Sequence, residues 1–275
     1  MNKFKLRKMK KQMIKLVGVF ILIIVFQAKA QEYDQIVIPL SSPDKTGALK
    51  LSLPNGTIKV TGYSGKDVIL KVSTEQQKIN KGTKDGLMKI PNRSLGITAK
   101  ESENLVTVSG GYNRDVIMEI QVPTKFDLKL TGHNGGDFTV ENINGNVEIT
   151  NHNAGIAARN ISGAAILNSH NGDITATFVS VTPDTPMAFT TFNGDVDITF
   201  PPTVKATFKM RSERNDILTD FELNLKEAKT KESGRDEDGV YKISIEEWTV
   251  GDVNGGGPEM LFKTYNGDVI IRKKK

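Results

Sequence analysis

The chain of 275 residues contains no cysteine. This absence excludes a disulfide framework, a thiol nucleophile, a zinc–thiolate site and a lipid-anchored N-terminal cysteine. The folded part of the chain must therefore be stabilised by packing and hydrogen bonding alone.

Acidic residues are missing from residues 1–30, which hold eight lysines and arginines. The formal net charge of +5 is therefore misleading. Without these eight, the 37 basic residues fall to 29 and stand against 32 acidic ones, which leaves a net charge of −3. A mildly acidic body has no electrostatic reason to bind nucleic acid, so we expect no nucleic-acid partner.

Long apolar runs are also scarce. The run Leu16–Phe26 has 11 residues, whereas a membrane-spanning helix needs about 20. It follows a basic stretch and precedes Ala28-Lys29-Ala30, which has the small-x-small pattern of a signal cleavage site. We therefore predict a signal peptide over residues 1–30, export, and a mature chain from Gln31 without a transmembrane helix. The alternative is an uncleaved N-terminal anchor.

Catalytic signatures are absent as well. The sequence has no G-x-S-x-G, no H-E-x-x-H, no P-loop and no dinucleotide-binding fingerprint. Gly255–Pro258 is Gly-rich, but no Lys-Ser/Thr follows it to bind phosphate. We therefore expect no enzymatic activity, no cofactor and no catalytic residues.

What the sequence does contain is a repeat. A His-Asn element begins at His133, His152 and His170, with spacings of 19 and 18 residues. An Ile-Asn/Ser-Gly element alternates with it at Ile143 and Ile161. The same frame returns at Pro54-Asn55-Gly56-Thr57, Phe192-Asn193-Gly194-Asp195, Arg214-Asn215-Asp216 and Tyr265-Asn266-Gly267-Asp268.

Each repeat unit has the pattern of a turn followed by a strand. Asn-Gly suits a tight turn, because Gly tolerates positive φ and Asn or Asp can bond to its own backbone. After one such turn, Val147 and Ile149 share one face while Glu148 and Thr150 share the other. An alternation of period two with one apolar face is typical of a half-buried strand. We therefore predict an all-β fold with Val147 and Ile149 pointing inward.

Two arrangements could bury these strands. The strands could pair in sequence as an antiparallel meander, or the chain could wind as a β-solenoid with each strand stacked on one a coil earlier. The similarity is stronger at 18–19 residues than at nine, which favours a solenoid with two strand-turn units per coil. We predict one β-solenoid domain over residues 31–275, with less regular strands over 31–130 and clear repeats over 131–275. After Asn171 the spacing of the Asn residues lengthens to 22, so we expect a longer strand or a third side there.

The less regular part still contains six strand patterns, and the chain carries two insertions. Asn80–Ser94 is polar and Gly-rich and is expected to be a loop; Leu223–Gly239 is highly charged. Gly251–Pro258 is expected to be a turn before the last strand. The six expected strands are Ile36–Leu40, Ala48–Leu53, Val68–Val72, Leu105–Ser109, Val116–Val122 and Phe126–Leu130.

Three segments carry a family resemblance. Met187–Phe200, Phe208–Phe221 and Leu261–Arg272, the last preceded by Gly255–Pro258, resemble a widespread bacterial family of β-strand-repeat domains of unknown function, the putative adhesins. The resemblance covers most of residues 45–272. It implies an exported envelope protein with a β-solenoid body, and the family has no agreed catalytic residues to transfer.

We therefore expect a non-catalytic, exported protein of the periplasm or cell envelope, or outside the cell, that acts as an adhesin-like binding or structural module. Its partner would be an envelope protein or a glycan. One alternative is an envelope-stress or signalling accessory that binds a membrane protein or lipid. Another is a β-helical enzyme acting on polysaccharide. The final repeat runs almost to Lys275, which favours the periplasm over surface display.

The three histidines share one repeat position, so a solenoid would align them in a ladder. Such a ladder could bind a transition metal. However, the equivalent later positions hold Phe192 and Tyr265, and in-register rings project side by side rather than converging. We therefore expect a stack of rings at the turns and no metal site.

Two acidic groups could also carry chemistry. Asp195 and Asp197 lie on one strand face and could act as paired carboxylates. No matching acid, Arg or Lys cluster lies near them in sequence, so we expect no catalytic role. Asp236, Glu237 and Asp238 could hold calcium, but a solvated hairpin tip is the preferred interpretation. The Asn-Gly-Asp turns are attributed to turn geometry rather than to calcium, because they lack the dense Gly-Gly-x-Gly-x-Asp repeat.

The single tryptophan and a basic loop are candidate contact sites. Trp248 is expected to cover the flank of the solenoid, with a sugar or partner contact as the alternative. The basic loop is expected to be solvated, with lipid phosphates or acidic glycans as alternative ligands. Its residues are Lys78, Lys81, Lys84, Lys89 and Arg93.

The last strand, Asp268–Ile271, is expected to be the open end of the solenoid. An unpaired strand edge invites pairing with another molecule. Arg272–Lys275 would then repel a second copy and protect this edge from aggregation. The alternative role for these basic residues is contact with an acidic surface.

The signal peptide can be tested directly. Because Ala28-Lys29-Ala30 ends the apolar run, N-terminal sequencing of the exported protein should begin Gln31-Glu32-Tyr33. A membrane-bound protein that still carries Met1 would contradict the prediction.

Overall fold

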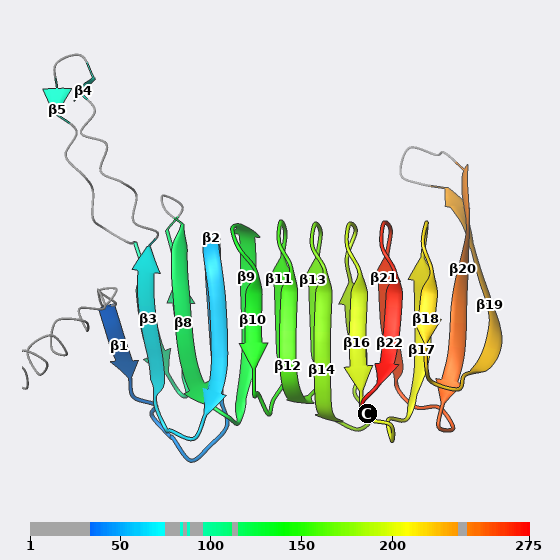
Figure 1. The fold of residues 1–275 in the computed structure, drawn as a ribbon, viewed down its shortest axis with the longest axis horizontal. Coiled ribbons are helices and arrows are strands. Elements are labelled where there is room, and N and C mark those ends of the chain that lie inside the picture. The colour runs from blue at the N-terminus through cyan, green and yellow to red at the C-terminus, as the bar shows by residue number, and fades with distance from the viewer. Residues whose placement is uncertain (1–33, 75–82, 85–86, 89–95, 112–114, 236–240) are drawn as a thin grey trace, which may run out of the picture. The chain divides into compact units, whose positions relative to one another are not determined.

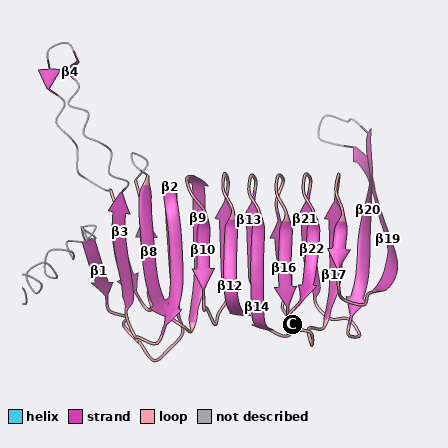
Figure 2. Cartoon of the chain, viewed as in Figure 1, coloured by secondary structure: helices cyan, strands magenta, loops and turns pink. Residues whose placement is uncertain are grey.

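A computed structural model describes residues 34–74, 83–84, 87–88, 96–111, 115–235 and 241–275. These residues form strands and loops and contain no helix, so none of them provides an apolar helix that could span a membrane. Figure 2 shows strands and connecting loops throughout this part of the chain. The predicted all-β class is confirmed. The predicted signal peptide lies outside the described residues.

Twenty strands form one continuous, largely parallel network of hydrogen bonds, arranged in two layers (Figure 1). The long strand β2 runs through both layers: its second half lies in what we call the first layer, and its first half lies in the second layer. In the first layer β1 and β3 are antiparallel to their neighbours and the other pairings are parallel. Its spatial order is β1 (Asp34–Ile38), β3 (Val68–Thr74), β8 (Val116–Pro123), the second half of β2 (Gly47–Tyr63), β10 (Phe138–Glu141), β12 (Ile156–Gly163), β14 (Ile174–Val181), β16 (Val196–Phe200), β22 (Val269–Lys273) and β18 (Ile217–Thr219).

The second layer is parallel between β7 and β17, and antiparallel strands flank it at both ends. Its spatial order is β6 (Thr98–Ser102), β7 (Leu105–Ser109), the first half of β2, β9 (Phe126–Asn134), β11 (Val147–Asn151), β13 (Ala165–Ser169), β15 (Met187–Thr190), β21 (Glu259–Thr264), β17 (Ala206–Ser212), β20 (Tyr241–Val253) and β19 (Asn224–Arg235). A separate short pair joins β4 (Thr83–Lys84) to β5 (Leu87–Met88).

Strands that follow one another in the repeat region alternate between the layers. In the second layer Leu128 pairs with Val147, 19 residues later, and in the first layer Ile156 pairs with Ile174, 18 residues later. These parallel registers exclude the antiparallel meander in the repeat region and are consistent with a β-solenoid-like fold. The spacing of 22 between Asn171 and Asn193 arises in the turn over residues 182–186 rather than in a longer strand or a third side.

The apolar side of each strand faces the opposite layer. Val147 and Ile149 are buried, whereas Thr150 is exposed, so the predicted faces are confirmed. Phenylalanines link the coils and the layers. Phe178 stacks on Phe200 in the first layer, with ring centroids 5.0 Å apart, and meets Phe189 of the second layer edge to face at 6.1 Å. One hydrophobic core therefore runs between the layers.

All six strands expected before residue 131 are present; β1 begins and ends two residues earlier than expected, and β2, β3, β8 and β9 are longer. The charged insertion after Leu223 is largely strand. It forms the long antiparallel pair β19–β20, in which Asn224 pairs with Asp252 and Arg235 with Tyr241. The expected turn at Gly251–Pro258 begins later, because β20 continues to Val253.

The last coil, β21–β22, is not the open end of the stack, so this prediction was wrong. β21 lies between β15 and β17, and β22 lies between β16 and β18. Figure 1 shows the red C-terminal strands set between earlier ones, with the C-terminus beside them. Among the described strands, β21 and β22 alone pair both with the preceding coils and with β17 or β18. The C-terminal coil therefore joins β17–β20 to the rest of the stack.

The gatekeeper hypothesis for the basic tail loses its basis, because the tail contacts neighbouring coils. Arg272 makes a bidentate ion pair with Asp197, with N–O distances of 2.8–3.1 Å. The hydrogen bond and charge of Asp197 hold the pKa of Arg272 above its ordinary value. The Lys273 amide donates to Asp220, and its Nζ lies 5.3 Å from the centre of the Phe221 ring. These contacts extend the pairing of the final strand.

The bridging role of the C-terminal coil can be tested with Phe262→Ala. Phe262 is fully buried, and its ring centroid lies 5.3 Å from those of both Phe189 and Phe208. Removing the ring should lower the free energy of unfolding by about 3–5 kcal/mol. Amides of β17 and β20 should lose hydrogen-exchange protection before those of β10–β14.

Leu261→Ala is the matched control, since Leu261 precedes Phe262 on the outward side of the same strand and is partly exposed. It should cost about 1 kcal/mol or less in urea unfolding. Equal losses for the two variants, or uniform exchange along the stack, would contradict the bridging role.

Candidate functional site

The turns that lead from the second layer to the first carry a continuous stack of rings. In order it contains His133, His152, His170, Phe192 and Tyr265, with successive centroid distances of 4.8, 4.8, 5.1 and 4.7 Å. The predicted ring stack is therefore confirmed. Figure 1 shows the corresponding turns, such as those from β13 to β14 and from β21 to β22, along one edge of the stack.

A second ladder runs beside the rings, one residue further along each turn. Four side-chain hydrogen bonds of 2.7–3.0 Å connect its five members, each from one Asn amide to the side-chain oxygen of the Asn in the preceding coil. Asparagine suits this position because its side chain can donate and accept at once. The members are Asn134, Asn153, Asn171, Asn193 and Asn266.

Hydroxyls on the inner side complete the turns. Thr191 and Thr264 are buried and donate to the carbonyls of Gly172 and Gly194, at 2.9 and 2.8 Å. Gly194 has φ of +141°, and a Cβ there would come within 2.5 Å of the Gly172 carbonyl oxygen. The side chains of this edge are thus used to hold one coil against the next, which gives the repeat a structural explanation.

Asp195 and Asp197 both contact the C-terminal coil. Asp195 accepts the backbone amide of Asp268 at 2.8 Å, and Asp197 is occupied by the ion pair with Arg272. Arg272 lies 75 residues further along the chain, so proximity in sequence could not reveal it. Both carboxylates connect the C-terminal coil to its neighbour.

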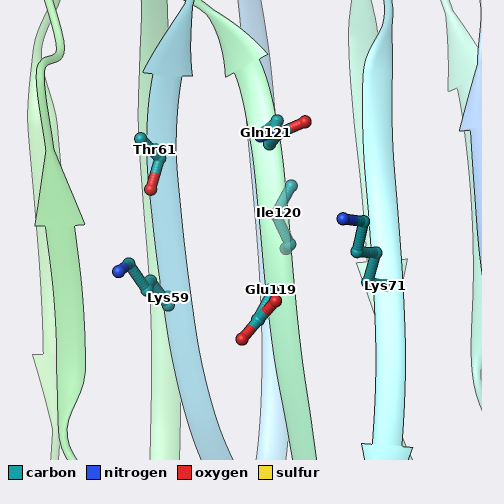
Figure 3. A pocket seen from close by; sticks show the side chains of 6 residues that line it. All are labelled: Lys59, Thr61, Lys71, Glu119, Ile120 and Gln121. Carbon is teal, nitrogen blue, oxygen red and sulfur yellow. The ribbon is translucent and has the colours of Figure 1, made fainter. Parts of the chain in front are cut away.

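The outer side of the first layer has a shallow polar hollow of about 180 Å³ (Figure 3). Lys59 and Thr61 of β2, Lys71 of β3, and Glu119 and Gln121 of β8 line it. Beside it, Glu141 makes ion pairs with Lys59 at 3.8 Å and with Arg159 at 3.2 Å. This face is therefore crossed by partly exposed charges of both signs.

The outer side of the second layer differs from this. A row of uncharged polar side chains crosses five successive strands, with each residue paired in register with the next. We call it the polar row; its members are Ser52, Thr131, Thr150, Asn168 and Thr190. The first three are exposed, and Thr190 donates a hydrogen bond to the Asn168 side chain. No sequence motif marks this row, because it depends on registers between distant strands.

The polar row leads to a cluster around Trp248. Thr190 pairs with Lys263 and Lys263 with Arg211. The Lys209 Nζ, the Arg211 Cζ and the Lys263 Nζ lie 4.9, 5.4 and 5.8 Å from the Trp248 ring centroid, respectively. Such distances permit cation–π attraction. Trp248 is partly exposed on the flank, as predicted.

Carboxylates also lie near this cluster. Glu213 pairs with Arg211 at 2.6 Å and Glu259 with Lys209 at 3.7 Å. Asp252 of β20 accepts hydrogen bonds from Lys226 and Thr207, and these lower the pKa of its carboxyl group below the ordinary value. The cations around Trp248 are therefore partly balanced by acids.

A hollow of about 430 Å³ lies on the same outer face. Its lining includes the exposed apolar side chains of Leu105 and Ile166, together with Pro186. The Lys129–Glu148 ion pair, at 2.7 Å, also borders it. The second layer thus combines an apolar depression, a hydroxyl- and amide-rich row and an aromatic residue, and we take this outer face as the candidate binding site.

Other candidate residues cannot be placed on either face. The acidic run Asp236–Asp238 lies outside the described residues, as do the side chains of the basic loop around Lys81. Within the described part of the chain, no group of three or more His, Asp or Glu side chains is arranged to hold a metal ion.

No family model and no curated protein matches the chain. Three solved structures are similar to it. A putative cell adhesion protein from Clostridium sporogenes is 9% identical, covers 88% of this chain and 100% of its own, and has a TM-score of 0.44. A putative adhesin from Bacteroides fragilis is 10% identical, with coverages of 89% and 98% and a TM-score of 0.39. One from Parabacteroides merdae is 8% identical, with the same coverages and a TM-score of 0.25.

The ring stack should not bind metal, because its histidines are stacked in parallel rather than directed at one point. Zinc at moderate excess should leave the melting temperature of the protein unchanged. If the histidines did bind zinc, a free zinc concentration of about 100 times Kd would add about 2.7 kcal/mol to the free energy of unfolding. A zinc-dependent rise that His152→Phe abolishes would contradict this prediction.

Proposed function

We propose that the protein is a non-catalytic, adhesin-like binding module of the bacterial cell envelope, exported through its N-terminal signal. Its body would be a β-solenoid closed by Asn-Gly-Asp turns. The observation that carries this proposal is the outer face of the second layer, where the polar row, the apolar hollow and Trp248 lie on one rigid sheet. Such an open surface, on which a polar row runs beside an apolar hollow, suits adhesion to an extended partner rather than enclosure of a small substrate.

The side chains that could carry out acid–base chemistry have structural contacts, which also supports a binding role. Asp195, Asp197 and the three histidines, which are the candidates for acid–base chemistry, contribute to contacts between coils. A polysaccharide-cleaving enzyme would instead need two carboxyl groups facing one bond of the substrate. The outer face of the second layer carries hydroxyls, amides and paired ions.

Location in the periplasm or envelope rests on the sequence. The basic segment, the apolar run Leu16–Phe26 and Ala28-Lys29-Ala30 have the order of an export signal. The resemblance of Met187–Phe200 and Leu261–Arg272 to exported bacterial domains agrees with that signal.

The proposal can be tested by blocking one face at a time. The absence of cysteine means that Thr150→Cys places a single thiol on the polar row, while Thr175→Cys places one at an exposed position on the outer side of the first layer. Each variant is labelled with a bulky maleimide, and its binding to isolated envelope fragments is measured by sedimentation.

The label at position 150 should weaken binding at least tenfold, whereas the label at position 175 should leave it within twofold of the unlabelled protein. Equal effects of the two labels, or no binding of the unlabelled protein, would contradict the proposed function.

A further inference from the structure

The polar row is a long uncharged row that the parallel registers produce on the outer face of the second layer. On the first layer, Thr139, Ala157 and Thr175 are in register, but the row then meets Asp197 and begins at Lys59. On the second layer the polar row continues uncharged from Ser52 to Thr190. If the polar row contained only threonine, the preference of threonine for strands would explain it. The difference between the layers, and the presence of Ser and Asn, need a further explanation.

The polar row is periodic along the stacking direction. Neighbouring strands lie about 4.8 Å apart, so the five residues span about 19 Å. They present one hydroxyl or amide at each step. A periodic surface matches a ligand that repeats at a similar interval and offers the same groups at each step. An extended β-1,4-linked glycan has these properties, because its sugar rings form a flat ribbon with hydroxyls along its edges.

The next row provides a suitable surface for the apolar faces of sugar rings. Ile166 pairs with Ala188, and Ala188 with Leu261, so a short apolar strip runs beside the polar row. The Ile166 side chain is 44% exposed and borders the 430 Å³ hollow. At the far end of the polar row, Trp248 adds a partly exposed aromatic group of the kind against which sugar C–H groups pack.

The charges near the polar row favour a neutral ligand over an acidic one. Lys50 and Lys129 lie two residues before Ser52 and Thr131 on the same strands, and Lys129 is paired with Glu148 at 2.7 Å. Towards the far end of the polar row, the three cations Lys263, Arg211 and Lys209 lie against the Trp248 ring. Two of the three also have a carboxylate partner. An acidic polymer would need unbalanced positive charge along its length, whereas all five residues of the polar row are neutral.

We propose that the outer face of the second layer binds a neutral, extended β-1,4-linked polysaccharide, which lies along the polar row with one end near Trp248. This inference rests on the proposed function and names its ligand class. The hydroxyls and amides of the row bond to the edges of the sugar rings. The strip from Ile166 to Leu261 contacts their apolar faces. Each contact is weak, so affinity arises from the number of sugars bound at once.

The test uses the exported protein and two pairs of neutral oligosaccharides, chitohexaose with chitobiose and cellohexaose with cellobiose. At least one hexamer should bind at least tenfold more tightly than its dimer, because only the hexamer reaches along the whole row. Calorimetry gives the affinities. Trp248 is the only tryptophan, so a change in its fluorescence on binding reports occupancy of the far end of the row.

Valine replacements then locate the site. Thr131→Val with Thr150→Val removes two hydroxyls from exposed strand positions while keeping the branched shape, and should weaken hexamer binding roughly tenfold or more. Thr139→Val with Thr175→Val, on the outer side of the first layer, is the matched control and should leave affinity unchanged. Melting temperatures within a few degrees of the parent protein establish that both double variants are folded.

Several outcomes would overturn the ligand class without touching the proposed function. If the label at position 150 blocks envelope binding but neither hexamer binds, the partner is not a neutral β-1,4 glycan. Preferential binding of oligogalacturonate would identify an acidic glycan instead, and binding to phosphatidylglycerol vesicles would identify a lipid surface. Equal weakening by the two valine pairs would place the glycan elsewhere on the protein. Failure of the labelling experiment itself would remove the proposed function.

Discussion

The in-register stacking of one coil on the next is the interaction on which the rest of the structure depends. Parallel pairing places the same repeat position of successive coils one strand spacing apart. Identical side chains of adjacent coils therefore contact one another, and their chemistry decides whether that contact stabilises the fold. Asparagine gains because each amide can donate to one neighbour and accept from the other, as Asn171 does between Asn153 and Asn193. Aromatic rings gain by stacking, and charged residues at such positions would repel one another unless paired.

This constraint also explains how the C-terminal coil can occupy the middle of the stack. The Tyr265-Asn266-Gly267-Asp268 turn matches the coils on both sides, because Tyr265 stacks on Phe192 and lies 5.0 Å from the Arg214 guanidinium, so it fits between β15–β16 and β17–β18. Asn266 donates to Asn193, and the Gly267 amide donates to Asn215 on the opposite side. This arrangement requires β21 and β22 to pair with strands far earlier in the sequence. Bringing such distant segments together costs loop-closure entropy, which grows slowly with the length of the intervening chain. The buried contacts of Phe262 with Phe189, which it stacks on, and with Phe208, which it meets edge to face, offset that cost.

Local alternation was sufficient to predict the strands and their inward faces, because burial of Val147 and Ile149 depends only on period two. The ring stack at His133, His152 and His170 was predictable for a similar reason: a fixed interval in sequence becomes a fixed interval in space once the coil length is known. The position of the last coil was not predictable in this way. Its repeat unit is compatible with any neighbouring coil, and sequence order suggested the end of the stack. The Asp197–Arg272 pair was missed for the same reason, since it exists only because β22 lies beside β16.

The candidate site is harder to predict from the sequence than the core is. An inward position must be apolar whatever its neighbours are, so the sequence shows it directly. A row on the outer face exists only when the registers of several strand pairs are known. Thr131 and Thr150 become neighbours because Leu128 pairs with Val147, and Thr190 joins them through Asn168. The same stacking that makes the interior repeat must also make the exterior repeat, so neutral rows and charged rows both extend along the stack. A repeating exterior can discriminate between partners by their period and length, a form of selectivity that a single enclosed pocket does not provide.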